Sequence, residues 1–128
     1  MKKRTGGRRS AVSRGEAAYA PDAGDLVWLS FSPQAGREQA GRRPALVLSP
    51  LAYNAKASLC LACPITQQAK GYPFEVRLPD GLSVGGVILS DHVKSTDWQV
   101  RQAAFIGRAP AAIVEEVAAK IMPLLGVV

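Results

Sequence analysis

Proline and glycine divide most of this chain into apolar runs that are too short to be globular helices. The clearest is PALVLSP, residues 44–50, where a short apolar run lies between two prolines. Such a run predicts a buried strand, because globular helices need roughly ten residues or more and proline interrupts their hydrogen bonds. Further runs rich in β-forming residues predict strands at 24–33, 58–65, 74–78, 85–91 and 99–108, with loops or turns between them that include 51–57 and 92–98.

The hydrophobic period changes in the last part of the sequence. Apolar side chains in residues 109–125 recur at the spacing of one helical face. Pro110 suits the first turn of a helix, and Pro123 should end or kink it. The segment therefore predicts one helix, and the residues of its buried face are Ile113, Val114, Val117, Ile121 and Leu124 or Leu125.

Five or six short strands and one closing helix define the expected fold class. We predict a mainly β domain with a C-terminal α-helix, in which a small twisted sheet curls into a partial barrel. A chain of 128 residues is long enough for one hydrophobic core and too short for two. The helix would cover one edge of the sheet, and a partner chain could cover another.

Positive charge is concentrated at the start of the sequence. Residues 1–15 hold six Lys and Arg and no acid, whereas residues 16–128 hold 10 basic and 10 acidic side chains. We therefore predict that residues 1–18 are a basic, disordered tail and that residues 19–128 are a single domain. The tail is interpreted as a passive extension, with a nucleic-acid-contacting arm or a transit peptide as alternatives. No apolar run of about 20 residues and no secretory signal pattern is visible, so we expect a cytoplasmic protein without a membrane partner.

Cys60 and Cys63 form a CxxC pair within the predicted strand 58–65. A zinc site needs two further ligands, and the only histidine is His92. A redox pair normally opens a helix. Since positions 60 and 63 of a strand point to opposite faces, we interpret both cysteines as small buried apolar residues. No cluster of carboxylates suited to Mg²⁺ is visible either, so we expect no metal and no other cofactor.

A dense charge cluster precedes the strand predicted at 44–50. In GREQAGRRPALVLSP, residues 36–50, Arg37, Glu38, Arg42 and Arg43 lie within seven residues. A solvated loop does not need so many charges beside a buried strand, whereas a site that binds an anion does need them. Arginine binds phosphate through two parallel N–H donors and stays charged at neutral pH. The cluster therefore predicts a local anion site on a body whose net charge is otherwise zero.

Four ordered blocks of sequence resemble the MazF/PemK family of toxin endoribonucleases, and its MazF branch more closely. The blocks are GDLVWLSFSPQAGREQAGRRPALVLSP, then YN, then CLACPITQQAKGYPFEV, then DHVKS, and the resemblance covers roughly residues 20–125. A lone RRP would carry no weight. Four blocks in order and at matching separations are specific.

The resemblance implies an SH3-like or CcdB-like barrel and a homodimer. It implies a metal-independent, sequence-specific endoribonuclease that cleaves single-stranded RNA, including mRNA, and so inhibits translation and growth. The implied products carry a 2′,3′-cyclic phosphate and a 5′-hydroxyl. The implied partners are single-stranded RNA and a cognate antitoxin with an acidic, disordered tail, through which the toxin–antitoxin complex would bind its operator DNA.

Three residues match catalytic positions of that family. Arg43 matches the catalytic arginine, and Thr66, at the end of a predicted strand, matches a catalytic threonine. Glu38 matches a functional carboxylate of the MazF branch. Because three neighbouring arginines favour its ionised form, we expect Glu38 to orient Arg43 or hold RNA rather than take a proton. From the residues alone, pairing of Arg43 with Glu38 and an ordinary turn role for Thr66 stay open.

Further polar residues are expected to contact RNA. Trp98, in the polar stretch STDWQVR, is a candidate for base stacking or a dimer interface, with packing as the default, whereas Trp28 is predicted to lie in the core. Asp91 matches an aspartate of the PemK branch, although a strand-end Asp is often a cap. The expected RNA-binding residues are Arg37, Gln39, Arg42, Lys70, Asp91, Lys94, Trp98 and Arg101.

Two other functions stay open on the same fold. One is a gyrase-inhibiting toxin without catalysis; that relative depends on C-terminal residues, typically a tryptophan, and this sequence ends MPLLGVV. The other is an inactive RNA-binding module. The presence of Glu38, Arg43 and Thr66 together favours the endoribonuclease.

Overall fold

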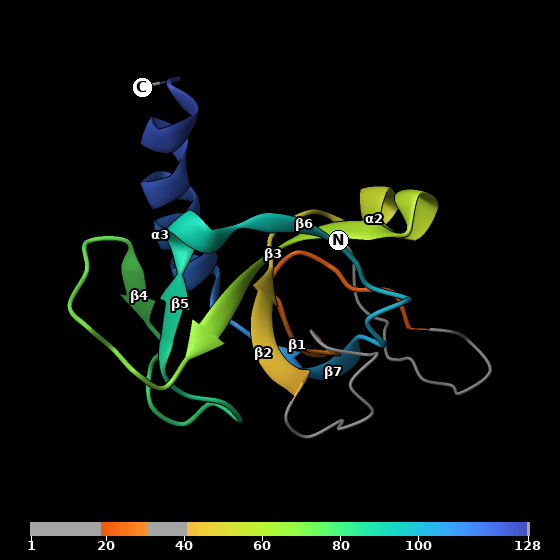
Figure 1. The fold of residues 1–128 in the computed structure, drawn as a ribbon, viewed down its shortest axis with the longest axis horizontal. Coiled ribbons are helices and arrows are strands. Elements are labelled where there is room, and N and C mark those ends of the chain that lie inside the picture. Colours follow the sequence, from red (N-terminus) through yellow and green to blue (C-terminus); the bar gives the residue numbers. More distant parts are fainter. Residues whose placement is uncertain (1–18, 31–40, 128) are drawn as a thin grey trace.

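Seven antiparallel strands form one curved sheet in the computed structural model (Figure 1), which describes residues 19–30 and 41–127. Their order in the sheet is β4-β5-β3-β2-β1-β7, and β6 also pairs with β3. Within the described residues the end strands β4 and β7 do not pair, so the barrel stays open and the predicted partial barrel is confirmed. The strands are β1 Asp25–Ser30, β2 Arg42–Val47, β3 Leu59–Thr66, β4 Glu75–Arg77, β5 Val87–Leu89, β6 Lys94–Asp97 and β7 Ala104–Arg108; the helices are α2 Leu51–Ala57 and α3 Ala111–Ile121, with 3₁₀ turns η2 Ser90–His92 and η3 Met122–Leu125.

Strand β3 joins the two halves of the sheet. It pairs with β2 along one side, and with β5 and then β6 along the other. Ile65 of β3 pairs with Ile88, and Ala62 of β3 pairs with Lys94. The two β3 residues are three positions apart in the sequence, whereas their partners are six positions apart. The additional residues form η2, which leaves the ladder and exposes the side chain of Asp91.

Strand β6 corrects the loop expected at 92–98. Its side chains are Lys, Ser, Thr and Asp, which give no apolar alternation in the sequence. The strand forms because it pairs with Leu59–Ala62 of β3 and buries Thr96. The strand expected at 99–108 is correspondingly shorter, since residues 98–102 form a turn before β7 begins.

Two apolar clusters cover opposite faces of the sheet. Alternate residues of β1, β2 and β3 contribute to one cluster or the other, as the period of a strand requires. Cys60 and Cys63 are both buried and free, and they lie in different clusters, which confirms their interpretation as apolar residues. The cluster beneath α3 includes Leu26, Leu46, Cys63, Ile65, Ile88 and Val117; the opposite cluster includes Val27, Leu29, Val47, Cys60, Ala62 and Trp98.

Trp28 is more exposed than expected, whereas the burial of Trp98 agrees with the default expectation of packing. Trp28 was expected in the core but is 38% exposed: it points to the α3 side of β1, between Pro44 and Ala104, whose small side chains cannot cover it. Trp98 is 6% exposed, and its indole N–H donates to the backbone oxygen of Asn54 (2.9 Å). Packing is therefore confirmed for Trp98, and its burial contradicts the candidate role in base stacking.

Residues 51–57, expected to be a turn or a single helical turn, form the helix α2. Its Asn54, from the YN block, is completely buried and links three segments. The Asn54 amide donates to the backbone oxygens of Pro21 (2.8 Å) and Ser49 (2.9 Å), and its Oδ1 accepts a hydrogen bond from Ser49 Oγ (2.6 Å). A buried amide with every contact satisfied fixes the position of α2 against the sheet.

Helix α3 confirms the helix predicted from the 3.6-residue period. Pro110 stands immediately before it, and the chain changes to η3 next to Pro123. Val117 is buried, whereas Leu124 and Leu125 are exposed, contrary to the prediction, because the helical period ends before them. In the part of the chain that the structure describes, no helix is long and apolar enough to cross a membrane.

Gly86→Ala is expected to destabilise the sheet at the start of β5. Gly86 has φ +112°, and an added Cβ would lie 2.3 Å from the backbone oxygen of Thr66. Relief requires moving a strand, so we expect a loss of about 2–4 kcal/mol in the free energy of unfolding. Gly85→Ala is the matched control, since nothing lies within 4 Å of its added Cβ. Equal denaturation midpoints for the two variants would contradict the prediction.

Candidate active site

Arg43 and Thr66 lie on neighbouring strands, β2 and β3. The ladder between these strands pairs Ala45 with Pro64. This pair is the last of the ladder, so Arg43 and Thr66 lie two residues beyond it, one on each strand. Ala45 and Pro64 share a face because they are opposite one another, and residues two positions apart along a strand project from the same face. The sheet therefore directs these two side chains, which are distant in the sequence, to one surface.

The Arg43 side chain is exposed at the beginning of β2. Its backbone is fixed in the ladder, because Arg43 pairs with Leu29 of β1. Among the described residues, the guanidinium has neither a hydrogen-bond partner nor an ion-pair partner. The side chain is thus presented at the surface from a rigid strand, which suits the capture of a phosphate group.

Thr66 ends β3 with its hydroxyl group already oriented. Thr66 Oγ1 accepts a hydrogen bond from the backbone N–H of Gln68 (3.1 Å). A hydroxyl has one donor and two acceptor positions, so this contact leaves the hydroxyl proton available. The side chain can therefore donate to an oxygen atom of a ligand at the same surface as Arg43.

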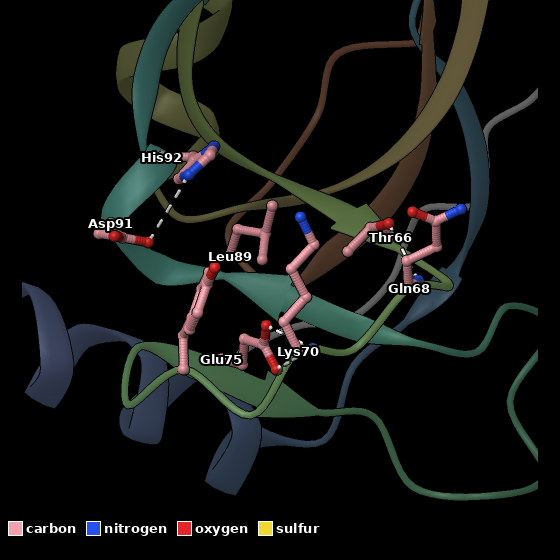
Figure 2. Close-up of a pocket in the computed structure, with 8 residues that line it drawn as sticks. Thr66, Gln68, Lys70, Glu75, Leu89, Asp91 and His92 are labelled. Atoms are coloured by element: carbon pink, nitrogen blue, oxygen red, sulfur yellow. Dashed lines mark hydrogen bonds and ion pairs between the residues drawn. The ribbon is translucent and has the colours of Figure 1, made fainter.

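A hollow of about 180 Å³ lies beside Thr66 (Figure 2). It is built at the ends of β3 and β5 and the start of β4, by the loop after β3 and by η2. In Figure 2 the Lys70 side chain extends from the loop toward the strand end that carries Thr66. The hollow combines a cation, an aromatic ring and hydroxyl, amide and carboxylate groups, and its lining residues are Thr66, Gln68, Lys70, Tyr72, Glu75, Leu89, Asp91 and His92.

The turn η2 forms the far wall of the hollow. Asp91 and His92 are both exposed, with 3.9 Å between Asp91 Oδ1 and His92 Nε2. Behind the turn, Cys63 Sγ donates to the backbone oxygen of Ser90 (3.8 Å). Burial, reinforced by the charge of Asp91, raises the pKa of Cys63 to about 12. The thiol is therefore protonated at neutral pH and supports the turn as a packed side chain, not as a nucleophile.

Other predicted RNA contacts gather at the end of β1. Arg101 Nη1 donates to the backbone oxygen of Ser30 (3.0 Å), and Arg42 Nη1 lies 3.4 Å from Ser30 Oγ. Arg42 and Arg43 are consecutive in a strand and so project from opposite faces. Lys94 is exposed in β6, opposite Ala62 of β3.

The structure thus separates the predicted site residues into groups. Thr66, Lys70 and Asp91 line one hollow, with Arg43 directed to the face of Thr66 by the strand register. Arg42 and Arg101 meet at Ser30, and Trp98 is buried in the core. The predictions for Arg37, Glu38 and Gln39 lie outside the described residues.

Sequence reasoning missed several residues of the hollow. Tyr72 and Glu75 lie in the KGYPFE block, and Gln68 lies two residues after Thr66. His92, at the start of the segment expected to be a loop at 92–98, lines the same hollow. The sequence does contain a signal for Gln68, Tyr72 and Glu75, because they follow a strand end that carries a candidate catalytic residue, and polar loops at such places often contact ligands. No local pattern indicated that η2 would lie across from that loop.

Comparison with known proteins gives consistent matches. A family model described as PemK-like, MazF-like toxin of type II toxin–antitoxin system matches residues 22–125. The endoribonuclease toxin MazF of Escherichia coli (strain K12) is 50% identical over 108 residues, which cover 84% of this chain and 96% of that protein.

Solved structures from Deinococcus radiodurans match as well. MazF alone is 60% identical, with a TM-score of 0.77, and the match covers 85% of this chain and 99% of the other. A MazE–MazF complex contains a chain that is 54% identical, also with a TM-score of 0.77, over 85% of this chain and 98% of the other. With this fold and these matches, the chain belongs to the family of PemK-like, MazF-like toxins of type II toxin–antitoxin systems.

Proposed function

We propose that this chain is the endoribonuclease toxin of a toxin–antitoxin module. It cleaves single-stranded RNA, including mRNA, at a short sequence, and so inhibits translation and growth. The observation that carries the proposal is the strand register that directs Arg43 and Thr66 to one face, beside a hollow that contains Lys70. Family membership and relatives named as endoribonucleases support it.

In the proposed mechanism, the 2′-hydroxyl of the RNA attacks the adjacent phosphorus atom. Arg43 binds the non-bridging phosphate oxygens with its planar fork of donors, and the Thr66 hydroxyl donates a further hydrogen bond to the same oxygens. These contacts stabilise the charge that develops in the transition state. Glu38 orients Arg43. Solvent water takes the proton of the 2′-hydroxyl as the new bond to phosphorus forms, and water returns a proton to the 5′-oxygen as its bond to phosphorus breaks. The products are a 2′,3′-cyclic phosphate on one side of the cut and a 5′-hydroxyl on the other.

RNA binding extends from this centre along the surrounding polar surface. Lys70 supplies positive charge inside the hollow, and Asp91, in its wall, can accept hydrogen bonds from a base. Arg42 and Arg101 extend the basic surface at the end of β1. We also retain Arg37, Gln39 and Lys94 as proposed RNA contacts, whereas Trp98 is excluded by its burial.

The proposed partners include a cognate antitoxin and a second copy of the chain. The relative from Deinococcus radiodurans has been solved as a MazE–MazF complex, which supports an antitoxin partner for this chain. An acidic, disordered antitoxin segment would bind the arginine cluster by mimicking RNA. The side chains of Met122, Leu124 and Leu125, after the end of α3, are apolar and exposed, which supports a protein interface there. We propose that a second copy of the chain binds at this interface and forms a homodimer. The complex would bind operator DNA through the antitoxin, in the cytoplasm.

The purified protein is expected to cleave a single-stranded transcript in the presence of EDTA. The proposed chemistry needs an arginine and a hydroxyl, and the described residues contain no group of three or more His, Cys, Asp or Glu that could hold a metal ion. Primer extension would map the cut sites, and the ends would be identified by their response to phosphatase and kinase. Cleavage that requires added Mg²⁺, or products with a 5′-phosphate, would contradict the mechanism.

A further inference from the structure

The loop of residues 67–72 follows Thr66, leads through the turn at 73–74 into β4, and carries Lys70 into the hollow. At its first end, the N–H of Gln68 donates to Thr66 Oγ1 (3.1 Å). At the same end of the loop, Gln67 Nε2 donates a hydrogen bond to the backbone oxygen of Gly85 (2.9 Å). The position of this loop therefore influences both the orientation of the Thr66 hydroxyl and the place of the Lys70 ammonium group.

Glu75 holds the last end of the same loop. The backbone N–H of Lys70 lies 3.2 Å from Glu75 Oε1 and 3.0 Å from Oε2, and the N–H of Gly71 lies 3.0 Å from Oε1. Gly71 has φ +79°, a conformation that glycine adopts at no steric cost and that lets successive N–H groups face one anion. The N–H of Glu75 donates in turn to the backbone oxygen of Tyr72 (3.1 Å), which closes the turn.

The Glu75 carboxylate accepts hydrogen bonds from the loop. Both its oxygens accept hydrogen bonds from backbone donors, as Figure 2 shows beside Lys70. Its backbone is fixed as well, because Glu75 pairs with Leu89 of β5. A negative charge beside an RNA site weakens phosphate binding, so attraction of the substrate cannot be its contribution.

We infer that Glu75 is a positioning residue for RNA cleavage. By holding the N–H groups of Lys70 and Gly71, it fixes the loop that sets the Thr66 hydroxyl and the Lys70 ammonium group against the RNA. The inference rests on the proposed function, and it assigns to Glu75 an action through Thr66 and Lys70 without contact with the reacting atoms.

Two substitutions separate positioning from charge. Glu75→Gln removes the charge but keeps an oxygen that can accept from both loop N–H groups, as Oε1 does now. Glu75→Asp keeps the charge but is one methylene shorter, so its reach to the loop is lost. Positioning predicts that kcat falls about 10- to 100-fold in Glu75→Asp and less than about threefold in Glu75→Gln. KM should change little in Glu75→Asp, and it should fall in Glu75→Gln because a repulsive charge is lost.

The measurement is kcat at saturating concentration of an RNA oligonucleotide that carries one site mapped for the wild type. Hydrogen exchange supplies a second readout, and the amides of residues 67–72 should exchange faster in Glu75→Asp than in Glu75→Gln while β2 and β3 stay protected. Glu116→Gln, on the exposed side of α3, is the control for charge and should match the wild type in both readouts.

Three outcomes would overturn the inference. Equal kcat values for Glu75→Asp and Glu75→Gln, or a larger loss for Glu75→Gln, would assign the effect of Glu75 to its charge. Unchanged loop exchange in Glu75→Asp would show that the carboxylate does not hold the loop. Absence of cleavage by the wild type in every buffer would overturn the proposed function and this inference together, whereas the first two outcomes, with an active wild type, would leave the proposed function standing.

Discussion

Replacing Arg43 with alanine is expected to lower kcat/KM for RNA cleavage by about 10²–10³-fold, the usual loss when one preorganised donor to a developing oxyanion is removed. The fold should survive, because the Arg43 side chain is exposed and its place in the ladder with Leu29 depends on backbone groups alone. Cleavage kinetics on an oligonucleotide with one mapped site, together with circular dichroism, measure both expectations.

Arg43→Lys separates charge from shape at the same position. Lysine keeps the positive charge but replaces the planar fork with a point charge, so we expect an activity between those of the wild type and Arg43→Ala. Lys56→Ala, on the exposed side of α2, removes a positive charge near the start of β3, at the opposite end of that strand from Thr66, and should cleave at the wild-type rate. A loss below about tenfold for Arg43→Ala, with an unchanged spectrum, would exclude this residue from the chemistry.

The fold was predictable where apolar periodicity determines the element. The prolines around residues 44–50 and the 3.6-residue period of 109–125 indicated β2 and α3, both of which the structure confirms. Strand β6 was not predictable in this way, because Lys94–Asp97 contains no apolar residue and becomes a strand only through its partner in β3. The same limit explains the tryptophans: exposure depends on which side chains lie on the neighbouring strands, and that depends on register.

The site was predictable residue by residue but not as an arrangement. The charge cluster and the family resemblance indicated Arg43 and Thr66 separately, and only the pairing of β2 with β3 directs them to the same face. The hollow was missed because its lining comes from the loop after β3, the end of β5 and the turn η2, which meet only after the sheet has formed. Glu75 was missed for a different reason, since its partners are backbone N–H groups, which leave no mark in the sequence.

Thr66→Val is expected to lower kcat by about 10²-fold or more, because valine keeps the β-branched shape suited to a strand end but has no hydroxyl to donate to the phosphate. Thr66→Ser should retain most of the activity, since serine keeps both the donor and the acceptor for the N–H of Gln68. The serine variant therefore distinguishes loss of the hydroxyl from loss of the methyl group. If serine and valine variants cleave equally well, the hydroxyl has no catalytic role.

The double variant Arg43→Ala/Thr66→Val tests whether the two side chains act on the same phosphate. If both stabilise one developing charge, the loss of the first donor already removes part of the benefit of the second. The combined loss should then be smaller than the product of the two single losses. Independent roles, such as catalysis by Thr66 and distant RNA binding by Arg43, would give losses that multiply. A fully multiplicative cycle would therefore contradict the shared site that the register of β2 and β3 indicates, even if each single variant were strongly impaired.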